Sequence, residues 1–132
     1  MTTGKRRVGA LLFAVLMTVG FTACGGGGDS GPKAYVEPKG PSTETISIEA
    51  QNFSFTPDHP TANAGIATIK LTSAGGAHDL VFDGAYPGFQ VEVSGSGSTD
   101  SQKIDLKPGK YTFYCNFPGH RAAGMEGTLT VK

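Results

Sequence analysis

The sequence predicts an all-β fold, a Greek-key β-sandwich of seven or eight strands, for residues 44–132. Two observations lead to this fold class. Short runs in which apolar and polar residues alternate are separated by clusters of Gly, Pro, Ser and Asp, which favour turns. No stretch has the apolar spacing of an amphipathic helix. The 20 glycines among the 132 residues fit a chain that turns often.

Eight runs along the chain have the alternation of half-buried strands. They are residues 45–50, 53–55, 67–73, 78–83, 89–94, 102–107, 110–115 and 127–132. In the second run, alternation places Phe53 and Phe55 on the same face. In the seventh, it places Tyr111, Phe113 and Cys115 together. These faces are expected to meet in one core between two sheets.

The first 23 residues have the features of a secretory signal. Basic residues at positions 5–7 precede an apolar-rich stretch, residues 8–19, which is too short to span a bilayer comfortably. A buried core helix is the alternative for this stretch, but the basic flank favours a signal. The sequence GFTAC, residues 20–24, resembles the cleavage box of bacterial lipoproteins. This resemblance implies that Cys24 becomes the lipidated first residue.

Residues 24–43 are expected to form the lipidated cysteine and a flexible linker, since the segment is rich in Gly and Pro and lacks the apolar residues of a core. The chain would then have three parts: a lipoprotein-type signal peptide at 1–23, this tether at 24–43 and one folded domain at 44–132. Such a protein is expected to be exported and lipid-anchored to the extracytoplasmic face of a bacterial membrane, in the periplasm or at the cell surface.

The charge balance does not indicate a nucleic-acid surface. The formal net charge is +0, but three of the 11 basic residues lie in the leader, which has no acidic residue. Removing residues 1–23 leaves 8 basic and 11 acidic side chains, a net charge of −3. No basic stripe remains, so we expect no nucleic-acid partner.

The two cysteines of the chain lie in different contexts. Cys24 ends the leader, whereas Cys115 lies among residues that bind metals. A disulfide between them is one alternative. If Cys24 is lipidated, Cys115 is instead a lone thiol in an oxidising compartment. Such a thiol is reactive unless its sulfur is bound to another group.

Three soft donors, Cys115, His120 and Met125, lie five residues apart between the last two predicted strands. A loop that leaves one strand and enters the next can direct all three to one point. A fourth donor, His78, opens another predicted strand and can reach the same end of a sandwich. His59 lies in a turn between prolines and is interpreted as a surface residue. Each donor alone has an ordinary structural explanation, as a core or turn residue, so the prediction depends on the combination.

Two imidazoles, a thiolate and a weak thioether form the donor set of blue-copper electron-transfer sites. Structural zinc sites prefer more cysteines. A c-type haem needs Cys-x-x-Cys-His, and a dinuclear copper centre needs a second cysteine in the loop; the sequence has neither. We therefore expect one copper ion, cycling between Cu(II) and Cu(I), with the ligands His78, Cys115, His120 and Met125.

The segment YTFYCNFPGHRAAGMEGTLTV, residues 111–131, resembles the C-terminal signature of the cupredoxins, the plastocyanin, azurin and auracyanin family. AHDLVF, residues 77–82, resembles the family's segment around its first histidine ligand. The resemblance implies an eight-stranded Greek-key sandwich. It also implies a type 1 (blue) copper site in which the two histidines and the cysteine are equatorial ligands and Met125 is the axial one.

Two positions depart from the usual pattern of that family. Asp79 follows the first histidine, where an asparagine is common, and an ionised carboxylate can only accept hydrogen bonds. Arg121 follows the second histidine at a position that is expected to be exposed. There it would add a positive charge to an apolar docking face.

The expected function is electron transfer by a mononuclear type 1 copper protein that is not an enzyme. With only His59 left over, no second copper site can be assembled, and no nucleophile-elbow motif supports hydrolysis. The resemblance implies that electrons enter and leave near His120. The expected contact patch consists of small or apolar residues: Gly75, Gly76, Ala77, Phe117, Pro118, Ala122 and Ala123.

The expected partners are redox proteins that dock transiently near His120, and the membrane through the lipid anchor; the protein itself is expected to be a monomer. One alternative is an extracytoplasmic lipoprotein that uses the same ligands for copper delivery or storage. Another is a metal-free sandwich that serves as a binding module.

Overall fold

The computed structural model describes residues 34–132, and this part of the chain contains strands and turns but no helix. The predicted all-β sandwich is confirmed. The strands are β1 (Glu44–Gln51), β2 (Ser54–Thr56), β3 (Thr61–Ala62), β4 (Gly65–Ser73), β5 (His78–Phe82), β6 (Val91–Val93), β7 (Thr99–Leu106), β8 (Gly109–Tyr114) and β9 (Glu126–Val131). The predicted signal peptide, the predicted lipidation site at Cys24 and the tether up to residue 33 lie outside the described residues.

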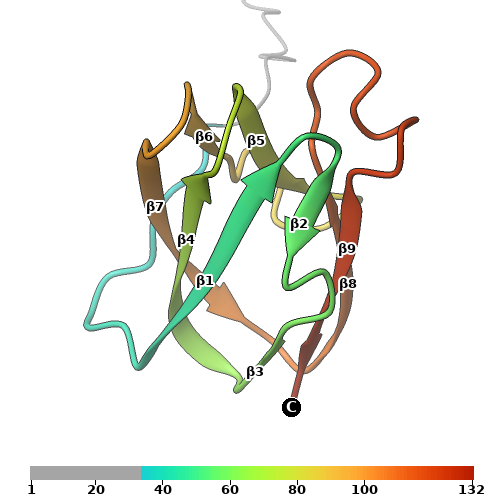
Figure 1. Cartoon of the computed structure of the whole chain (residues 1–132). Helices are drawn as coiled ribbons and strands as arrows, with labels where there is room; N and C mark the ends of the chain where they lie inside the picture. The colour runs from blue at the N-terminus through green and yellow to red at the C-terminus, as the bar shows by residue number, and fades with distance from the viewer. Residues whose placement is uncertain (1–33) are drawn as a thin grey trace, which may run out of the picture. The chain divides into compact units, whose positions relative to one another are not determined.

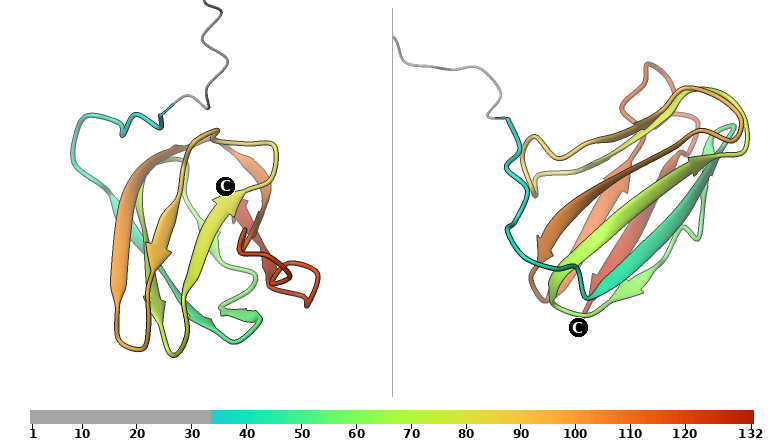
Figure 2. Two further views of the ribbon diagram at one scale, coloured as in Figure 1. Left: turned by 90° about the horizontal axis from the view of Figure 1, so that it is seen from above. Right: turned by 90° about the vertical axis from the view of Figure 1, so that its left-hand side faces the viewer.

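The strands form two sheets that lie as separate layers (Figures 1 and 2). One sheet has the order β2-β1-β4-β7 and the other has the order β3-β9-β8-β5-β6. Most neighbours are antiparallel, but β1 runs parallel to β4, and β3 runs parallel to β9. Because parallel neighbours cannot be joined by a tight turn, the chain crosses from one sheet to the other between them, as Greek-key connections do.

Alternate residues of each strand fill the space between the sheets. In β4, Ala67, Ile69 and Leu71 are no more than 1 % exposed, whereas Lys70 between them is exposed. The same alternation appears in the other long strands, such as β1 and β9. The period-2 pattern of the sequence therefore predicts the core faces correctly.

The prediction for residues 53–55 is right for only one of its two phenylalanines. Phe55 in β2 is 4 % exposed and belongs to the core. Phe53 lies in the turn between β1 and β2 with a φ of 63°, and 49 % of its surface is exposed. The left-handed backbone of this turn removes Phe53 from the strand, so the alternation does not extend to it.

The additional ninth strand is β3, which has two residues and follows Pro60. It pairs in parallel with β9, through Thr61 opposite Thr130 and Ala62 opposite Val131. Two residues are too few to show a period of two, so sequence alternation cannot reveal such a strand.

The end of the predicted tether packs along the edge of the first sheet. Lys103 of the edge strand β7 donates its backbone N–H to the Glu37 carboxylate (2.9 Å), and its carbonyl accepts from the Tyr35 hydroxyl (3.0 Å). Lys103 Nζ also donates to the Gly40 carbonyl (3.3 Å). The Tyr35 ring meets the Phe89 ring edge to face at 5.2 Å. Residues 35–40, here called the brace, therefore contact the sandwich and are not a free linker.

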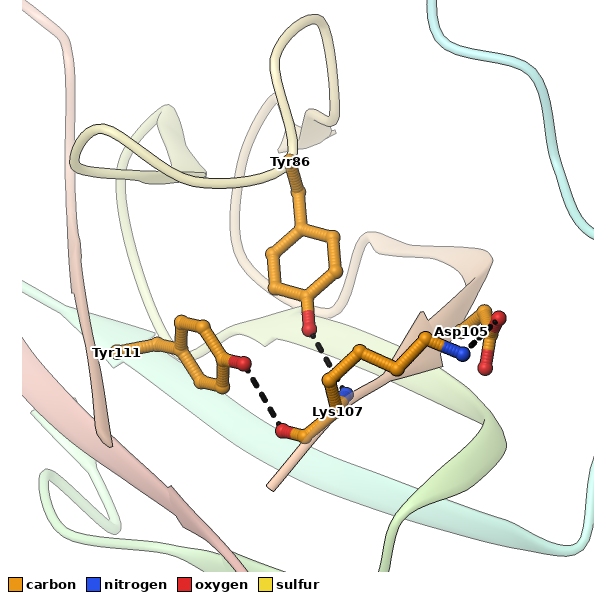
Figure 3. Close-up of polar contacts among 4 residues, drawn as sticks. All are labelled: Tyr86, Asp105, Lys107 and Tyr111. Carbon is orange, nitrogen blue, oxygen red and sulfur yellow. Dashed lines mark hydrogen bonds and ion pairs between the residues drawn. The ribbon is translucent and has the colours of Figure 1, made fainter. Parts of the chain in front are cut away.

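Two tyrosine hydroxyls hold the turn between β7 and β8 (Figure 3). The Tyr111 hydroxyl donates to the Lys107 carbonyl (2.9 Å), four residues upstream, in the arrangement known as a tyrosine corner. The Lys107 N–H donates to the Tyr86 hydroxyl (3.2 Å), and Lys107 Nζ pairs with Asp105 (2.7 Å). The loop after β5, which carries Tyr86, is thereby tied to the β7–β8 turn.

Candidate metal centre

Three connections meet at the upper end of the sandwich in Figure 1, opposite the end that carries the labelled C terminus. They are the β1–β2 turn, the β4–β5 turn and the loop of residues 115–125 between β8 and β9, here called the ligand loop. His78 is the first residue of β5, directly after its turn. Cys115 directly follows β8, and Met125 directly precedes β9. Strand pairing between β5, β8 and β9 therefore brings the predicted donors to one place.

The structure brings three of the four predicted donors into one cluster. The donor atoms of His78, Cys115 and His120 all lie within 4.8 Å of one another. The His120 Nδ1 atom is 3.3 Å from His78 Nδ1 and 3.4 Å from Cys115 Sγ. Met125, the fourth predicted donor, is fully buried in the same loop. Its backbone N–H donates to the His120 carbonyl (3.1 Å), and its carbonyl accepts from the Cys115 N–H (3.0 Å).

The His78 ring is oriented by a backbone hydrogen bond. Its Nε2 atom lies 2.9 Å from the Gly75 carbonyl, which can only accept, so Nε2 carries the proton and Nδ1 has a free lone pair. The turn that presents this carbonyl is itself tied, because the Ser73 hydroxyl accepts from the Gly75 N–H (3.1 Å) and donates to the Gly76 carbonyl (2.8 Å). The His78 lone pair is thus directed at the cluster by neighbouring residues.

The chemistry of the cluster fits a metal ion. A metal ion with bonds of roughly 2.0–2.1 Å to nitrogen and roughly 2.3 Å to sulfur separates its donors by roughly 3.3–3.6 Å. The two distances from His120 Nδ1, 3.3 Å to His78 Nδ1 and 3.4 Å to Cys115 Sγ, match this spacing. Facing imidazole lone pairs beside a sulfur repel one another unless a cation or a proton lies between them. Two imidazoles, a thiolate and a buried thioether suit copper. Within residues 34–132, no second group of His, Cys, Asp and Glu side chains has metal-ligand spacing.

The Cys115 thiol is buried and carries no disulfide. Burial raises the pKa of this thiol, backbone N–H groups of Asp79 and Phe117 that donate toward the sulfur lower it, and the nearby Asp79 carboxylate raises it again. The net direction is upward. Since metals bind the thiolate, metal binding must displace this proton.

Asp79 connects the two segments that carry the donors. It is 1 % exposed, and its Oδ1 accepts from the Asn116 N–H (2.6 Å), next to Cys115. Its Oδ2 accepts from the Gln90 side-chain amide (2.8 Å). The sequence singles out Asp79 but gives no sign of Gln90, because this contact depends on the pairing of β5 with β6.

The His120 ring lies between aromatic side chains at the surface. Its centroid is 5.2 Å from that of Phe53 and 5.7 Å from that of Phe117. His120 and Phe117 are half-buried, and Phe53 is exposed. Sequence reasoning missed Phe53 because it assigned this residue to the core. The predicted contact patch also contains uncharged residues that are exposed or half-buried: Gly75, Gly76, Ala77, Pro118, Ala122 and Ala123. Together with Phe53, Phe117 and His120 they are called the docking face below.

Arg121 is exposed as predicted, but its charge is neutralised, so it does not add a free positive charge to the docking face. Its guanidinium pairs with Asp83 (2.7 Å) and with Glu126 (3.1 Å). It also lies over the Tyr114 ring, 4.0 Å from the centroid. These contacts fasten the ligand loop to the ends of β5 and β9, and the three charges sum to −1.

His59 is a surface residue, as predicted; its side chain is 74 % exposed and its Nδ1 lies 2.9 Å from Asp58. It takes no part in the cluster. Residues 34–132 contain no helix that is long and apolar enough to cross a membrane.

Comparison with known proteins agrees with the geometry. The model of the family "Copper binding proteins, plastocyanin/azurin family" matches residues 42–132. A plastocyanin of Dryopteris crassirhizoma is 37 % identical over 101 residues, covering 66 % of this chain and 96 % of that protein. An azurin of Pseudomonas fluorescens biotype C is 47 % identical over 46 residues, covering 32 % of this chain and 35 % of the azurin.

Solved structures show the same fold. A structure of auracyanin B superposes with a TM-score of 0.63 at 20 % identity, covering 77 % of this chain and 96 % of that one. The family match spans the whole sandwich together with the clustered donors, and so this chain belongs to the copper-binding plastocyanin/azurin family, the cupredoxins.

Proposed function

We propose that the protein is a mononuclear type 1 (blue) copper electron carrier with the ligands His78, Cys115, His120 and Met125. The observation that carries this proposal is the convergence of two imidazole Nδ1 atoms and a thiol sulfur within 4.8 Å. The loop that supplies two of these donors also carries a buried methionine, and the chain belongs to a copper-binding family. When bound, copper supplies a one-electron couple between Cu(II) and Cu(I).

The residues around the cluster hold the donors through contacts that do not involve a metal. The Gly75 carbonyl orients His78, and backbone bonds within the ligand loop connect Cys115, His120 and Met125. The Arg121 ion pairs fasten the same loop to two strands. A site that is preformed in this way changes little between two oxidation states, which favours fast electron exchange.

His120 is the route by which electrons would leave the cluster, because its ring is the donor that reaches the surface. The docking face around it carries no charged side chain. Small and aromatic residues allow a partner to approach closely without strong ion pairs, which suits brief, weak redox encounters. A transient redox protein is therefore the proposed partner.

We also propose that residues 1–23 are a lipoprotein-type signal peptide and that lipidated Cys24 tethers the domain to the extracytoplasmic face of a bacterial membrane. The basic start, the apolar stretch and the GFTAC sequence support this. Such a tether would confine the search for a redox partner to the plane of the membrane. It would thereby raise the effective concentration of the protein near partners on the same membrane.

The function is tested by adding Cu(II) to the purified protein and recording the visible spectrum. An intense thiolate-to-copper band is expected; it should disappear in Cys115→Ser and persist in the control His59→Ala, which removes an exposed imidazole outside the cluster. Reversible one-electron reduction should accompany the band. A colourless protein would contradict copper binding at Cys115. Fast transfer of the copper to an apoprotein acceptor, without electron exchange, would instead indicate copper delivery.

A further inference from the structure

The Asp79 side chain is a buried carboxyl group that nitrogen donors contact on both oxygens. Its two oxygens accept hydrogen bonds from the Asn116 backbone N–H (2.6 Å) and the Gln90 amide nitrogen (2.8 Å). A backbone N–H can only donate, and the Gln90 amide presents its donor side to Asp79. Nitrogen donors on both oxygens are the partners that a carboxylate takes, and this one is 1 % exposed.

The Asp79 carboxylate has no cationic partner in the described part of the chain. The ion pairs recorded there are Asp58 with His59, Asp105 with Lys107, and Asp83 and Glu126 with Arg121. Carboxylates are rarely buried without a cation or a metal, because desolvation of the charge is unfavourable.

The position of Asp79 relates it to the metal centre. It follows His78 on β5, and its Oδ1 holds the residue that follows Cys115. With a thiolate, two neutral imidazoles and a thioether, the ligand set carries a charge of −1. With bound Cu(II) the net charge of the centre would be +1, and with bound Cu(I) it would be zero. When the Asp79 carboxylate is included, the net charge becomes zero for Cu(II) and −1 for Cu(I). A buried region favours zero net charge, which is the Cu(II) state when Asp79 is included.

We propose that Asp79 is the buried counter-charge of the copper centre and favours Cu(II) over Cu(I), so that the protein has a lower reduction potential than it would have with a neutral residue at this position. The inference rests on the ligand set proposed above. Asp79 acts through its charge, as a positioning and tuning residue, and it does not bind the metal.

The test is Asp79→Asn in the full chain. Asparagine keeps the oxygen that accepts from Asn116, and its amide can donate to Gln90 after the Gln90 amide rotates, so the charge is lost while both hydrogen bonds remain possible. The ratio of Cu(II) to Cu(I) affinity is expected to fall by about tenfold or more, which raises the potential by about 59 mV per tenfold for a one-electron couple. Voltammetry of the copper-loaded protein measures this shift.

Two control variants separate charge from structure. Asp105→Asn makes the same chemical change at an exposed carboxylate paired with Lys107 and should leave the potential unchanged. Gln90→Met removes one hydrogen bond to Asp79 but keeps the charge, so it should leave the potential unchanged or lower it. If loosening of the ligand loop were the cause, Gln90→Met and Asp79→Asn would move the potential in the same direction.

Thermal unfolding of the copper-free proteins gives a readout that does not depend on the loaded centre. Copper-free Asp79→Asn should melt at the same temperature as the unsubstituted protein or higher, because the unpaired buried charge is gone. A potential for Asp79→Asn no higher than that for Asp105→Asn would overturn the proposal. Absence of the blue band in the unsubstituted protein would instead contradict the proposed function, so the two failures are distinct.

Discussion

Gly76 lies against the ring of His78, and two features of the structure require glycine at position 76. Its φ is +81°, a region that side chains other than glycine rarely adopt. A Cβ atom on it would also lie 3.1 Å from His78 Nε2, the atom that donates to the Gly75 carbonyl. A substitution here would therefore disturb the hydrogen bond that orients the ligand ring.

Gly76→Ala should weaken Cu(II) binding and broaden or shift the visible band, in addition to destabilising the fold by about 1–2 kcal/mol through its backbone conformation. The matched control is Gly84→Ala, which has a φ of +68° but no atom within 4 Å of the added Cβ. It should show the same loss of stability with an unchanged band. Equal Cu(II) affinities for the two variants, by competition with a chelator, would show that contact with His78 is unimportant.

The four donors could be recognised from the sequence because three of them lie close together in one loop and the fourth opens a strand. The residues that modify the site could not. Arg121 meets Asp83 across 38 positions, and Gln90 meets Asp79 across 11. These contacts depend on which strands become neighbours, and local alternation carries no information about that. Alternation places Phe53 in the core because it does not reveal that this residue lies in a turn with a left-handed backbone.

At the scale of elements, the loop after β5 and the β7–β8 turn are joined by Tyr86. Burial and then the nearby Tyr111 hydroxyl raise the pKa of Tyr86 to about 12, although the Lys107 N–H lowers it. In the unfolded chain a tyrosine titrates near pH 10. Between these two values the folded protein holds a proton that the unfolded chain has lost, so the free energy of unfolding falls as the pH rises.

The stability contributed by protonated Tyr86 should be complete below about pH 10 and be lost as the pH approaches about 12. Tyr86→Phe should lose about 1 kcal/mol at neutral pH, since the Lys107 N–H loses its acceptor. Its denaturation midpoint should then decline less steeply above pH 10 than that of the unsubstituted protein. Urea titrations at several pH values measure this, and parallel profiles would contradict it.

Sequence alternation predicts the long strands well and the short elements poorly. β1, β4 and β9 each have enough residues for a period of two to be visible. β3 has only two residues, and it can be recognised as a strand only from its parallel pairing with β9. Composition predicts a linker over residues 24–43, and it does not reveal that Tyr35 and Glu37 contact the edge of β7, because such contacts depend on single side chains.

At the scale of the whole molecule, the proposed lipid anchor at Cys24 can be tested on the intact protein. Expressed in a bacterium that processes lipoproteins, the protein should fractionate with membranes and have a mass increased by acyl chains. Cys24→Ala should be released from the membrane and lack the added mass, but keep the same visible copper band, since the copper site is built from residues 78–125. Membrane association that persists in this variant would contradict lipid anchoring at Cys24.

The brace also affects how copies of this protein behave toward one another. Lys103 offers a backbone N–H and a carbonyl at the outer edge of β7, and Glu37 and Tyr35 occupy both. A shortened chain that starts at Glu44 would leave these groups free, and an open strand edge is a template on which a strand of a second copy can pair. The brace thus covers the outer edge of β7 at Lys103, where edge-to-edge polymerisation of the sheet would otherwise begin.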